Sequence, residues 1–292
     1  EISGLNIKTY IDGISPDNNK NVTIKNCDVE SGDDGIVFKS SYTLNRLGKC
    51  EQITVENCEI RSRCNAIKFG TETNGGFFDI TVENVKISDT RLAGIAVESV
   101  DGATVKNLKF KNISMTNVCT PFFIHLGDRM RGPEGLKIGK MSDILFENVT
   151  ATGEYREYEI MPWNYDSYVK GDRKQYPWAI GKAENFNGEK DKNDPWQITS
   201  NCCGLRGFDL EKIVFKNVRL ELWGGAKKVN RSVPEKAQDY PEIYVYGTNL
   251  PAKGMYFRHI NGLTLENFEV KTINQDVRED FVFDDVKNLI VK

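Results

Sequence analysis

Three aspartates have the residue type and spacing to do chemistry in this 292-residue chain. Asp12 precedes one short strand-like segment, and Asp33 and Asp34 precede the next, with Asp34 lying 34 − 12 = 22 residues after Asp12. If successive windings of the chain stack, Asp12 and Asp34 lie on adjacent strands whose backbones are roughly 4.8 Å apart. Carboxylates this close cannot all ionise freely. A protonated acid beside an ionised base is suited to acid–base hydrolysis, such as cleavage of a glycosidic bond.

The doublet on its own has simpler explanations. Residues 31–34 could form an ordinary acidic turn or a calcium site. The presence of Asp12 one winding away favours catalysis. Strict alternation would point the acids into the core, where an unpaired carboxylate is costly. The chain is therefore expected to turn at Gly32, or at Gly13 and Gly35, and so to release the acids into a cleft.

A repeated phrase predicts the elements that position these acids. Alternating apolar residues followed by an asparagine recur at residues 22–27, 53–58, 80–85, 108–113, 144–149, 213–218 and 263–268. The period of two indicates short strands. The first asparagines are 57 − 26 = 31 and 84 − 57 = 27 residues apart, which is typical of a parallel β-helix. We expect the asparagines to form a ladder from winding to winding, although they could be simple surface turn residues.

A second family of strands follows the first and begins at a small residue. Alternation points one set of side chains inward: Ile36, Phe38, Ile67, Phe69, Ile95 and Val97. The other set then faces outward: Val37, Lys39, Lys68, Ala96 and Glu98. We expect a substrate to lie on this open outer face.

Composition excludes several classes of protein. The chain has 39 basic and 42 acidic side chains, a near balance that argues against nucleic-acid binding. No apolar stretch approaches the roughly 20 residues that cross a bilayer, which excludes a membrane-spanning helix. The seven cysteines lack metal-ligand spacing, so neither a disulfide scaffold, a metal site nor a cofactor is expected. The first residues read as the middle of a strand without a signal peptide, so we expect N-terminal coils to be missing.

The chain is predicted to form one domain over residues 1–292, interrupted by two long loops. The first loop, at about 153–208, is rich in aromatic residues, and the second spans about 223–257. Long loops in compact folds are often functional. Their aromatic rings could stack on sugars, or could pack the loop onto the coils.

These residues resemble a known family. Residues 12–17 and 31–36 resemble the Asn-Thr-Asp and Asp-Asp signatures of family 28 glycoside hydrolases, the polygalacturonase and rhamnogalacturonase group. Residues 69–76 are similar to a Gly-Ser-Glu segment of bacterial members, and the similarity extends to residues 254–259. The resemblance implies a right-handed parallel β-helix that hydrolyses a pectic backbone with inversion. It makes Asp33 the general acid, with Asp12 and Asp34 holding and activating the water.

The sequence also departs from the family pattern. The Asn-Thr pair before the first aspartate is Tyr10 and Ile11 here, and Gly-His-Gly becomes residues 64–66, Cys-Asn-Ala. The Arg-Ile-Lys segment, whose cations hold a uronate carboxylate in the family, falls on residues 96–98, Ala-Val-Glu. An acidic sugar would lose charge-assisted contacts at this position. Plain polygalacturonate is therefore the less favoured substrate.

Other side chains could compensate for these departures. Glu72, just past its strand, could replace the missing histidine as an acid–base partner. Lys68 could restore one cation, whereas a solvated charge without a role is the simpler interpretation for each basic candidate. The expected substrate-binding residues are Asn65, Lys68, Arg91, Lys39 and His125.

We therefore expect a hydrolase of an α-linked pectic polysaccharide or oligosaccharide, of rhamnogalacturonan type rather than plain polygalacturonate. Such an enzyme would work outside the cytoplasm, in the extracellular space or periplasm. One alternative is a pectate-lyase-like enzyme with calcium on the three aspartates and Lys68 or Arg91 as its base. Another is a carbohydrate-binding solenoid whose catalytic site has decayed.

Overall fold

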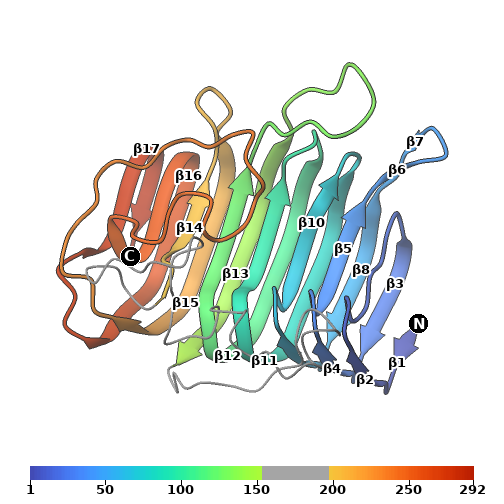
Figure 1. The fold of residues 1–292 in the computed structure, drawn as a ribbon, viewed down its shortest axis with the longest axis horizontal. Coiled ribbons are helices and arrows are strands. Elements are labelled where there is room, and N and C mark those ends of the chain that lie inside the picture. Colours follow the sequence, from blue (N-terminus) through green and yellow to red (C-terminus); the bar gives the residue numbers. More distant parts are fainter. Residues whose placement is uncertain (153–196) are drawn as a thin grey trace, which may run out of the picture.

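The computed structural model describes residues 1–152 and 197–292, and these form an all-β structure (Figure 1). Its main sheet is built from parallel pairings between segments about one winding apart in the chain. Ile24 pairs with Val55, Val55 with Val82, and Val82 with Phe110. Each winding therefore stacks on the previous one, as the repeated phrase predicts.

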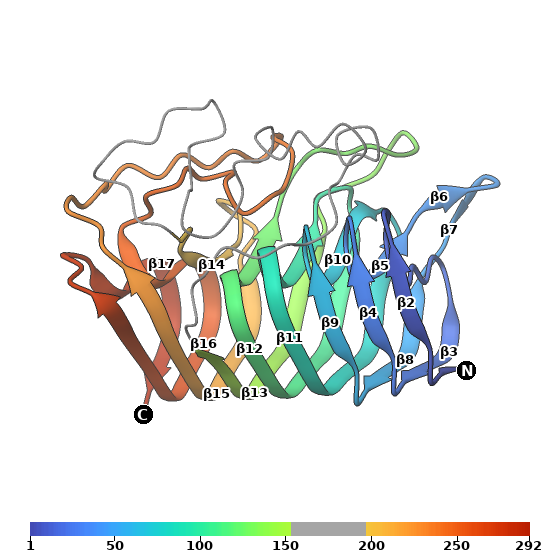
Figure 2. The ribbon, with the colours of Figure 1, turned by 60° about the horizontal axis from the view of Figure 1, so that its bottom comes forward.

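Three groups of strands stack along the windings (Figures 1 and 2). The first contains β1 (Ile2–Ser3), β3 (Lys20–Lys25), β8 (Cys50–Glu56), β11 (Gly76–Ser99), β12 (Thr104–Leu126), β13 (Lys140–Thr152), β15 (Leu210–Gly224), β16 (Ala252–Asn274) and β17 (Glu279–Val291). The second contains β2 (Asn6–Thr9), β4 (Asp28–Ser31) and β9 (Glu59–Ser62), which pairs with the middle of β11. The third contains β5 (Ile36–Ser40), β10 (Ile67–Thr73) and β14 (Ser200–Cys203), together with the later part of β11 and β12 and the start of β16. Two short strands, β6 (Tyr42–Thr43) and β7 (Arg46–Leu47), form an antiparallel hairpin.

The predicted asparagine ladder is confirmed. The side-chain amide of Asn112 donates to Asn84 Oδ1 at 3.0 Å, and Asn148 donates to Asn112 at 2.9 Å. Asn217 and Asn267 continue the series at 3.0 and 3.1 Å. All these asparagines have positive φ angles, which asparagine tolerates better than most residues. The ladder therefore fixes the same turn in successive windings.

The interior of the coils is apolar, as the alternation predicts. Ile36, Phe38, Ile67, Phe69, Ile95 and Val97 all lie in the main buried cluster. Phenylalanine rings stack along the axis: Phe110 and Phe146 have ring centroids 4.9 Å apart, and Phe146 and Phe215 4.6 Å. All seven cysteines are free and buried.

A second apolar cluster lies outside the coils. It joins outward-facing side chains of the third strand group, such as Ala96 and Phe123, to Ile243, Val245 and Leu250. The latter three belong to residues 225–251, which connect β15 to β16 and which we call the covering segment. Their packing shows that the covering segment lies on the outer face of the third strand group.

The two predicted loops need correction at their boundaries. Most of the first, residues 153–196 with its aromatic residues, lies outside the described residues. The remainder contains β14, which pairs in parallel with β12 and β16 and so belongs to the stacked sheet. The second loop is shorter than expected because β15 extends to Gly224 and β16 begins at Ala252. Over the two described ranges, no helix has the length and apolar character needed to cross a membrane.

Candidate active site

Asp12 and Asp34 lie on neighbouring windings, as predicted from their spacing. The backbone N–H of Gly13 donates to Asp34 O at 2.9 Å. The glycines allow this close approach: a Cβ on Gly13 would lie 2.5 Å from Gly35 O, and one on Gly35 would lie 2.5 Å from Ala66 O. The Asp-Gly pairs thus begin the third strand group where only a small residue fits.

Asp33 is held by its backbone and crowded by acids. The hydroxyls of Ser31 and Ser62 donate to its carbonyl oxygen at 2.7 and 2.6 Å. Its carboxylate lies within 4.8 Å of an Asp34 oxygen. Partial burial, then the charge of Asp34, then that of Asp12, raise the pKa of Asp33. Asp33 therefore retains a proton more readily than an ordinary aspartate and is suited to act as an acid.

Asp34 is buried and its negative charge is stabilised by fixed donors. Its Oδ1 accepts hydrogen bonds from Asn65 N at 3.0 Å and Asn65 Nδ2 at 2.9 Å. Its Oδ2 lies 3.6 Å from Lys68 Nζ. The Asn65 carbonyl oxygen Oδ1 in turn accepts from Ala93 N at 2.9 Å, which fixes the amide. Asp34 thus has fixed hydrogen-bond donors and a cation beside its carboxylate, whereas Asp33 lies beside the charges of two other acids.

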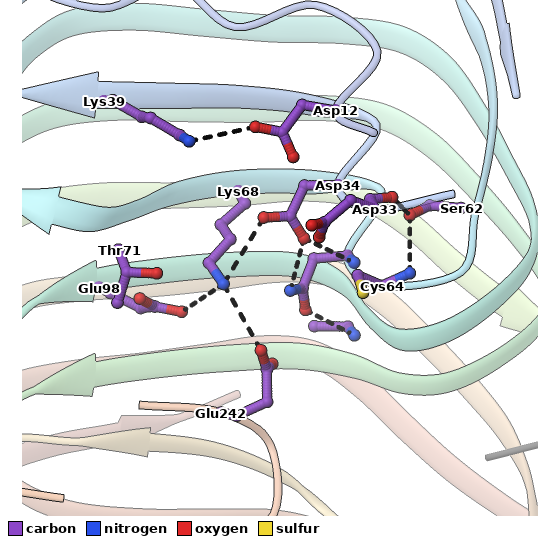
Figure 3. Close-up of polar contacts among 12 residues, drawn as sticks. Asp12, Asp33, Asp34, Lys39, Ser62, Cys64, Lys68, Thr71, Glu98 and Glu242 are labelled. Carbon is purple, nitrogen blue, oxygen red and sulfur yellow. Dashed lines mark hydrogen bonds and ion pairs between the residues drawn. The ribbon is translucent and has the colours of Figure 1, made fainter. Parts of the chain in front are cut away.

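Asp12 is partly exposed and pairs with Lys39 at 3.1 Å (Figure 3). The Ser15 hydroxyl also donates to it at 3.2 Å. Burial lowers the pKa of Lys39, but the Asp12 carboxylate more than offsets this, so the pKa is raised. Glu72 is exposed and lies 3.8 Å from Lys39. Lys39 therefore lies between Glu72 and Asp12. The role of Glu72 as a substitute for the missing histidine stays a prediction.

Lys68 lies at the centre of a buried group of acids (Figure 3). Its Nζ is 3.6 Å from Asp34, 3.5 Å from Glu98 and 3.5 Å from Glu242. Burial disfavours the ammonium, but the three carboxylates outweigh it, led by Asp34, so the pKa of Lys68 is well above its usual value. Burial is also the main reason that the pKa of Glu98 rises to about 8.

The expectation of an open outer face is wrong around Lys68. The covering segment packs on this face, so outward-facing side chains are buried beneath it. Of the five expected substrate-binding residues, four are buried: Asn65, Lys68, Arg91 and His125. Asn65 and Lys68 hold Asp34 instead. Lys39 is the candidate that remains partly exposed beside the acids.

His125 is buried beneath the covering segment, and one of its two ring nitrogens has a hydrogen-bond partner. Its Nδ1 lies 2.6 Å from the hydroxyl of Tyr246, a residue of the covering segment. Burial and, secondarily, the charge of Arg258 lower the pKa of His125 to about 3. The imidazole is therefore neutral at ordinary pH, and its burial is at odds with the expected substrate contact.

Sequence reasoning missed Glu242 entirely. It lies 174 residues after Lys68, in a segment without the repeated phrase. One isolated Glu in a loop gives no signal of its own. Only the packing of the covering segment brings it to the acids.

One group of side chains at this site has the geometry to hold a metal ion. Oxygens of Asp33 and Asp34 and the Sγ of Cys64 lie within 4.8 Å of one another. Burial, and then the charges of the two acids, raise the pKa of the Cys64 thiol well above its usual value. Metal ligation requires the thiolate, and calcium prefers oxygen ligands. The donor set therefore fits poorly the calcium that a lyase would need.

A carboxylic acid of raised pKa beside a second carboxylate is typical of enzymes that cleave glycosidic bonds. Comparison with known proteins agrees with this class. The chain belongs to the glycosyl hydrolases family 28, whose profile matches residues 6–161.

Two curated relatives are both named endo-polygalacturonase. The one from Pectobacterium parmentieri is 28% identical over 144 residues, and the one from Pectobacterium carotovorum subsp. carotovorum is 27% identical over 142 residues. Each alignment covers 48% of this chain and 33% of the relative. The chain thus spans about a third of the length of the curated relatives it matches.

Two solved structures share the fold. The family 28 exopolygalacturonase of Yersinia enterocolitica superposes with a TM-score of 0.57 at 16% identity, covering 95% of this chain and 38% of that one. The hyperthermoactive exopolygalacturonase of Thermotoga maritima gives a TM-score of 0.50 at 20% identity, covering 74% and 40%. Identity this low supports the fold alone.

Proposed function

We propose that this chain carries the catalytic site of a glycoside hydrolase that cleaves α-linkages in a pectic polysaccharide, on a right-handed parallel β-helix. The observation that carries the proposal is the contrast between the two adjacent acids. Asp33 has a raised pKa, whereas the negative charge of Asp34 is stabilised by Asn65 and Lys68. Membership of family 28 supports the same chemistry.

The residues suit an inverting mechanism. Asp33 donates its proton to the glycosidic oxygen as the bond from that oxygen to the anomeric carbon breaks. Asp34 and Asp12 orient a water and take its proton as the oxygen attacks the opposite face of the sugar. Inverting acids and bases are separated by roughly 6.5–9.5 Å. Because the Asp33 and Asp34 oxygens approach within 4.8 Å, we assign Asp12, one winding away, a share in placing the water.

The charge around the acids supports a rhamnogalacturonan-type substrate over plain polygalacturonate. Three protein carboxylates already engage Lys68, so its charge is not available to a sugar carboxylate. Glu98, at a position where the family resemblance implies a cation, is buried and acidic. The partly exposed cation beside the acids, Lys39, is paired with Asp12. A pectic substrate also fits the expected extracellular or periplasmic location.

The lyase alternative is weaker because its proposed bases are poorly suited. A general base must lose its proton near the working pH. Lys68 is buried and its pKa is raised well above the usual value, which is the opposite of what a base needs. Arg91 is buried as well.

The test is a screen of defined pectic oligosaccharides, including oligogalacturonides and rhamnogalacturonan fragments, with products followed by NMR. We expect new reducing ends of inverted configuration and no unsaturated product. Asp33→Asn should lower turnover by about 10²–10⁴-fold and leave binding intact. Ultraviolet-absorbing products would favour a lyase, and binding without any turnover would favour a decayed solenoid.

A further inference from the structure

Glu242 reaches the acids from the covering segment and contacts Lys68, one of the two residues that hold Asp34. Its Oε2 lies 3.5 Å from the Nζ of Lys68, and both side chains are buried. The same Nζ atom of Lys68 lies 3.6 Å from Oδ2 of Asp34. The Asn65 side chain donates to Asp34 and also lowers the pKa of Glu242. Glu242 and Asp34 therefore share the ammonium of Lys68.

We propose that Glu242 is a positioning residue for Asp34, and that its charge sets how strongly Lys68 stabilises the Asp34 carboxylate. The inference rests on the proposed function, in which Asp34 helps to activate water. Glu242 is not placed against the substrate. It acts on the reaction through Lys68.

The number of charges supports this role. One ammonium, on Lys68, faces three carboxylates at similar distances. Burial raises the pKa of Glu98 to about 8, so below this pH Glu98 is mostly protonated. Burial also raises the pKa of Glu242, although the charge of Lys68 opposes this. Once Glu242 is ionised, the charge of Lys68 is divided between Asp34 and Glu242. At short range in a buried site this division is strong, so an ionised Glu242 weakens the stabilisation of Asp34.

Other titratable groups face this cluster, and they are the same in the wild type and in a variant at Glu242. Arg129 acts on Glu98 from the end of β12, and Asp33 and Cys64 face the cluster from the turns before β5 and β10. Further charges and hydroxyls are contributed by Lys39, Tyr240 and Tyr244. None of these is altered by a substitution at Glu242, so a shift in titration can be assigned to that one charge.

Glu242→Gln removes the charge and keeps the shape of the side chain. Lys68 should then stabilise the ionised forms of Asp34 and Asp33 more strongly. Both limbs of the pH profile of kcat/KM should move to lower pH, by at least about 0.5 unit. Asp239→Asn is the matched control, because it removes one charge from the same segment at an exposed ion pair with Lys236. The control should leave the profile unchanged.

A second measurement does not depend on activity. Carbon-13 NMR of labelled glutamate carboxyls should show a group that titrates near pH 8 in the wild type and is lost in Glu98→Gln. In Glu242→Gln the same group should titrate at lower pH, because a neighbouring negative charge has gone. An unchanged titration of Glu98 would contradict the proposal that Glu242 and Glu98 interact with the same ammonium of Lys68.

The two measurements separate the possible failures. Hydrolysis by the variant with unshifted pH limbs would overturn the role of Glu242 alone. If Glu242→Gln shifts the titration of Glu98 but the wild-type protein hydrolyses no pectic substrate, the proposed function is overturned, and the role of Glu242 with it. If Glu242→Gln does not fold, Glu242→Asp draws the charge away from Lys68 and should shift both limbs in the same direction by a smaller amount. An unshifted profile in that variant also overturns the proposal.

Discussion

The side-chain amide of Asn65 donates a 2.9 Å hydrogen bond to Asp34 on the preceding winding, and its carbonyl accepts one from Ala93 on the next. Asn65 thus links three successive windings at the position where the family resemblance implies a histidine. Hydrogen bonds to charged groups are worth about 1.5–3 kcal/mol. Asn65→Ala should therefore lower kcat by about 10–100-fold.

The same substitution should also cost stability, because the buried N–H of Ala93 loses its acceptor. We expect a loss of about 1–3 kcal/mol in the free energy of unfolding, measured with urea. Asn107→Gly removes a half-buried asparagine that bonds Asp79 and keeps its positive φ without strain, so it serves as the control and should leave kcat unchanged. Full activity in Asn65→Ala would show that Asp34 does not depend on this amide.

Because Glu98 is buried, the free energy of unfolding should decrease as the pH rises, which is unusual for a glutamate. Its pKa is 4.5 in the unfolded chain and about 8 in the folded protein, so the folded state binds its proton more tightly. The stability that this proton provides is complete below pH 4.5 and is lost as the pH rises through 8. Glu98→Gln should match the wild type near pH 4.5 and exceed its stability at pH 9, by on the order of a few kcal/mol.

Denaturation at pH 4.5, 7 and 9 measures this difference. Glu147 provides a control of opposite sign, because the exposed partner Lys216 lowers its pKa. A Glu147→Gln variant should lose stability only above the usual pKa of a glutamate, and only slightly. Parallel pH curves for Glu98→Gln and the wild type would contradict the burial argument.

Much of the fold follows from local patterns in the sequence. Alternation places Phe38 and Phe69 inside because neighbouring side chains of a strand point to opposite faces. The repeated asparagines lie one winding apart, so their amides meet. The same regularity places Asp12 beside Asp34, since 22 residues bring the chain once around to the start of the same strand group.

The outer face could not be predicted in the same way. Alternation says that Lys68 and Glu98 point outward, but it does not say what packs on them. Residues 225–251 carry no repeat, and their apolar side chains, such as Ile243 and Val245, read as those of any loop. The covering segment is far from Lys68 in the sequence and packs on it only in the folded structure. The residues around Lys68 therefore give no indication that it is buried or that it contacts Glu242.

The contact between His125 and Tyr246 should hold the covering segment on the coils. Tyr246→Phe removes the hydroxyl that lies 2.6 Å from His125 Nδ1 and leaves a buried ring nitrogen without this partner. We expect a loss of about 1–3 kcal/mol in the free energy of unfolding. Equal stability of the variant and the wild type would show that the contact contributes nothing.

His125 itself should stay neutral throughout the working range. Its folded pKa, about 3, lies below the unfolded value of 6.5, so its contribution to stability is present above pH 6.5 and is lost as the pH falls toward 3. Imidazole nitrogen NMR between pH 5 and 8 should show no titration of this ring. A midpoint near 6.5 would mean that His125 is open to solvent and available to substrate.

The asparagine ladder makes a prediction that separates hydrogen bonding from backbone strain. Asn148 donates to Asn112, accepts from Asn217 and has a φ of 56°. Asn148→Ala loses both hydrogen bonds and places an alanine in the left-handed region, which together should cost about 2–4 kcal/mol. Asn148→Gly loses the same hydrogen bonds but adopts this φ without strain, so it should be destabilised less, by about 1–2 kcal/mol. Urea denaturation ranks the three proteins. Equal losses in the two variants would mean that only the amides matter, and a stable alanine variant would remove the ladder as a determinant of the turn.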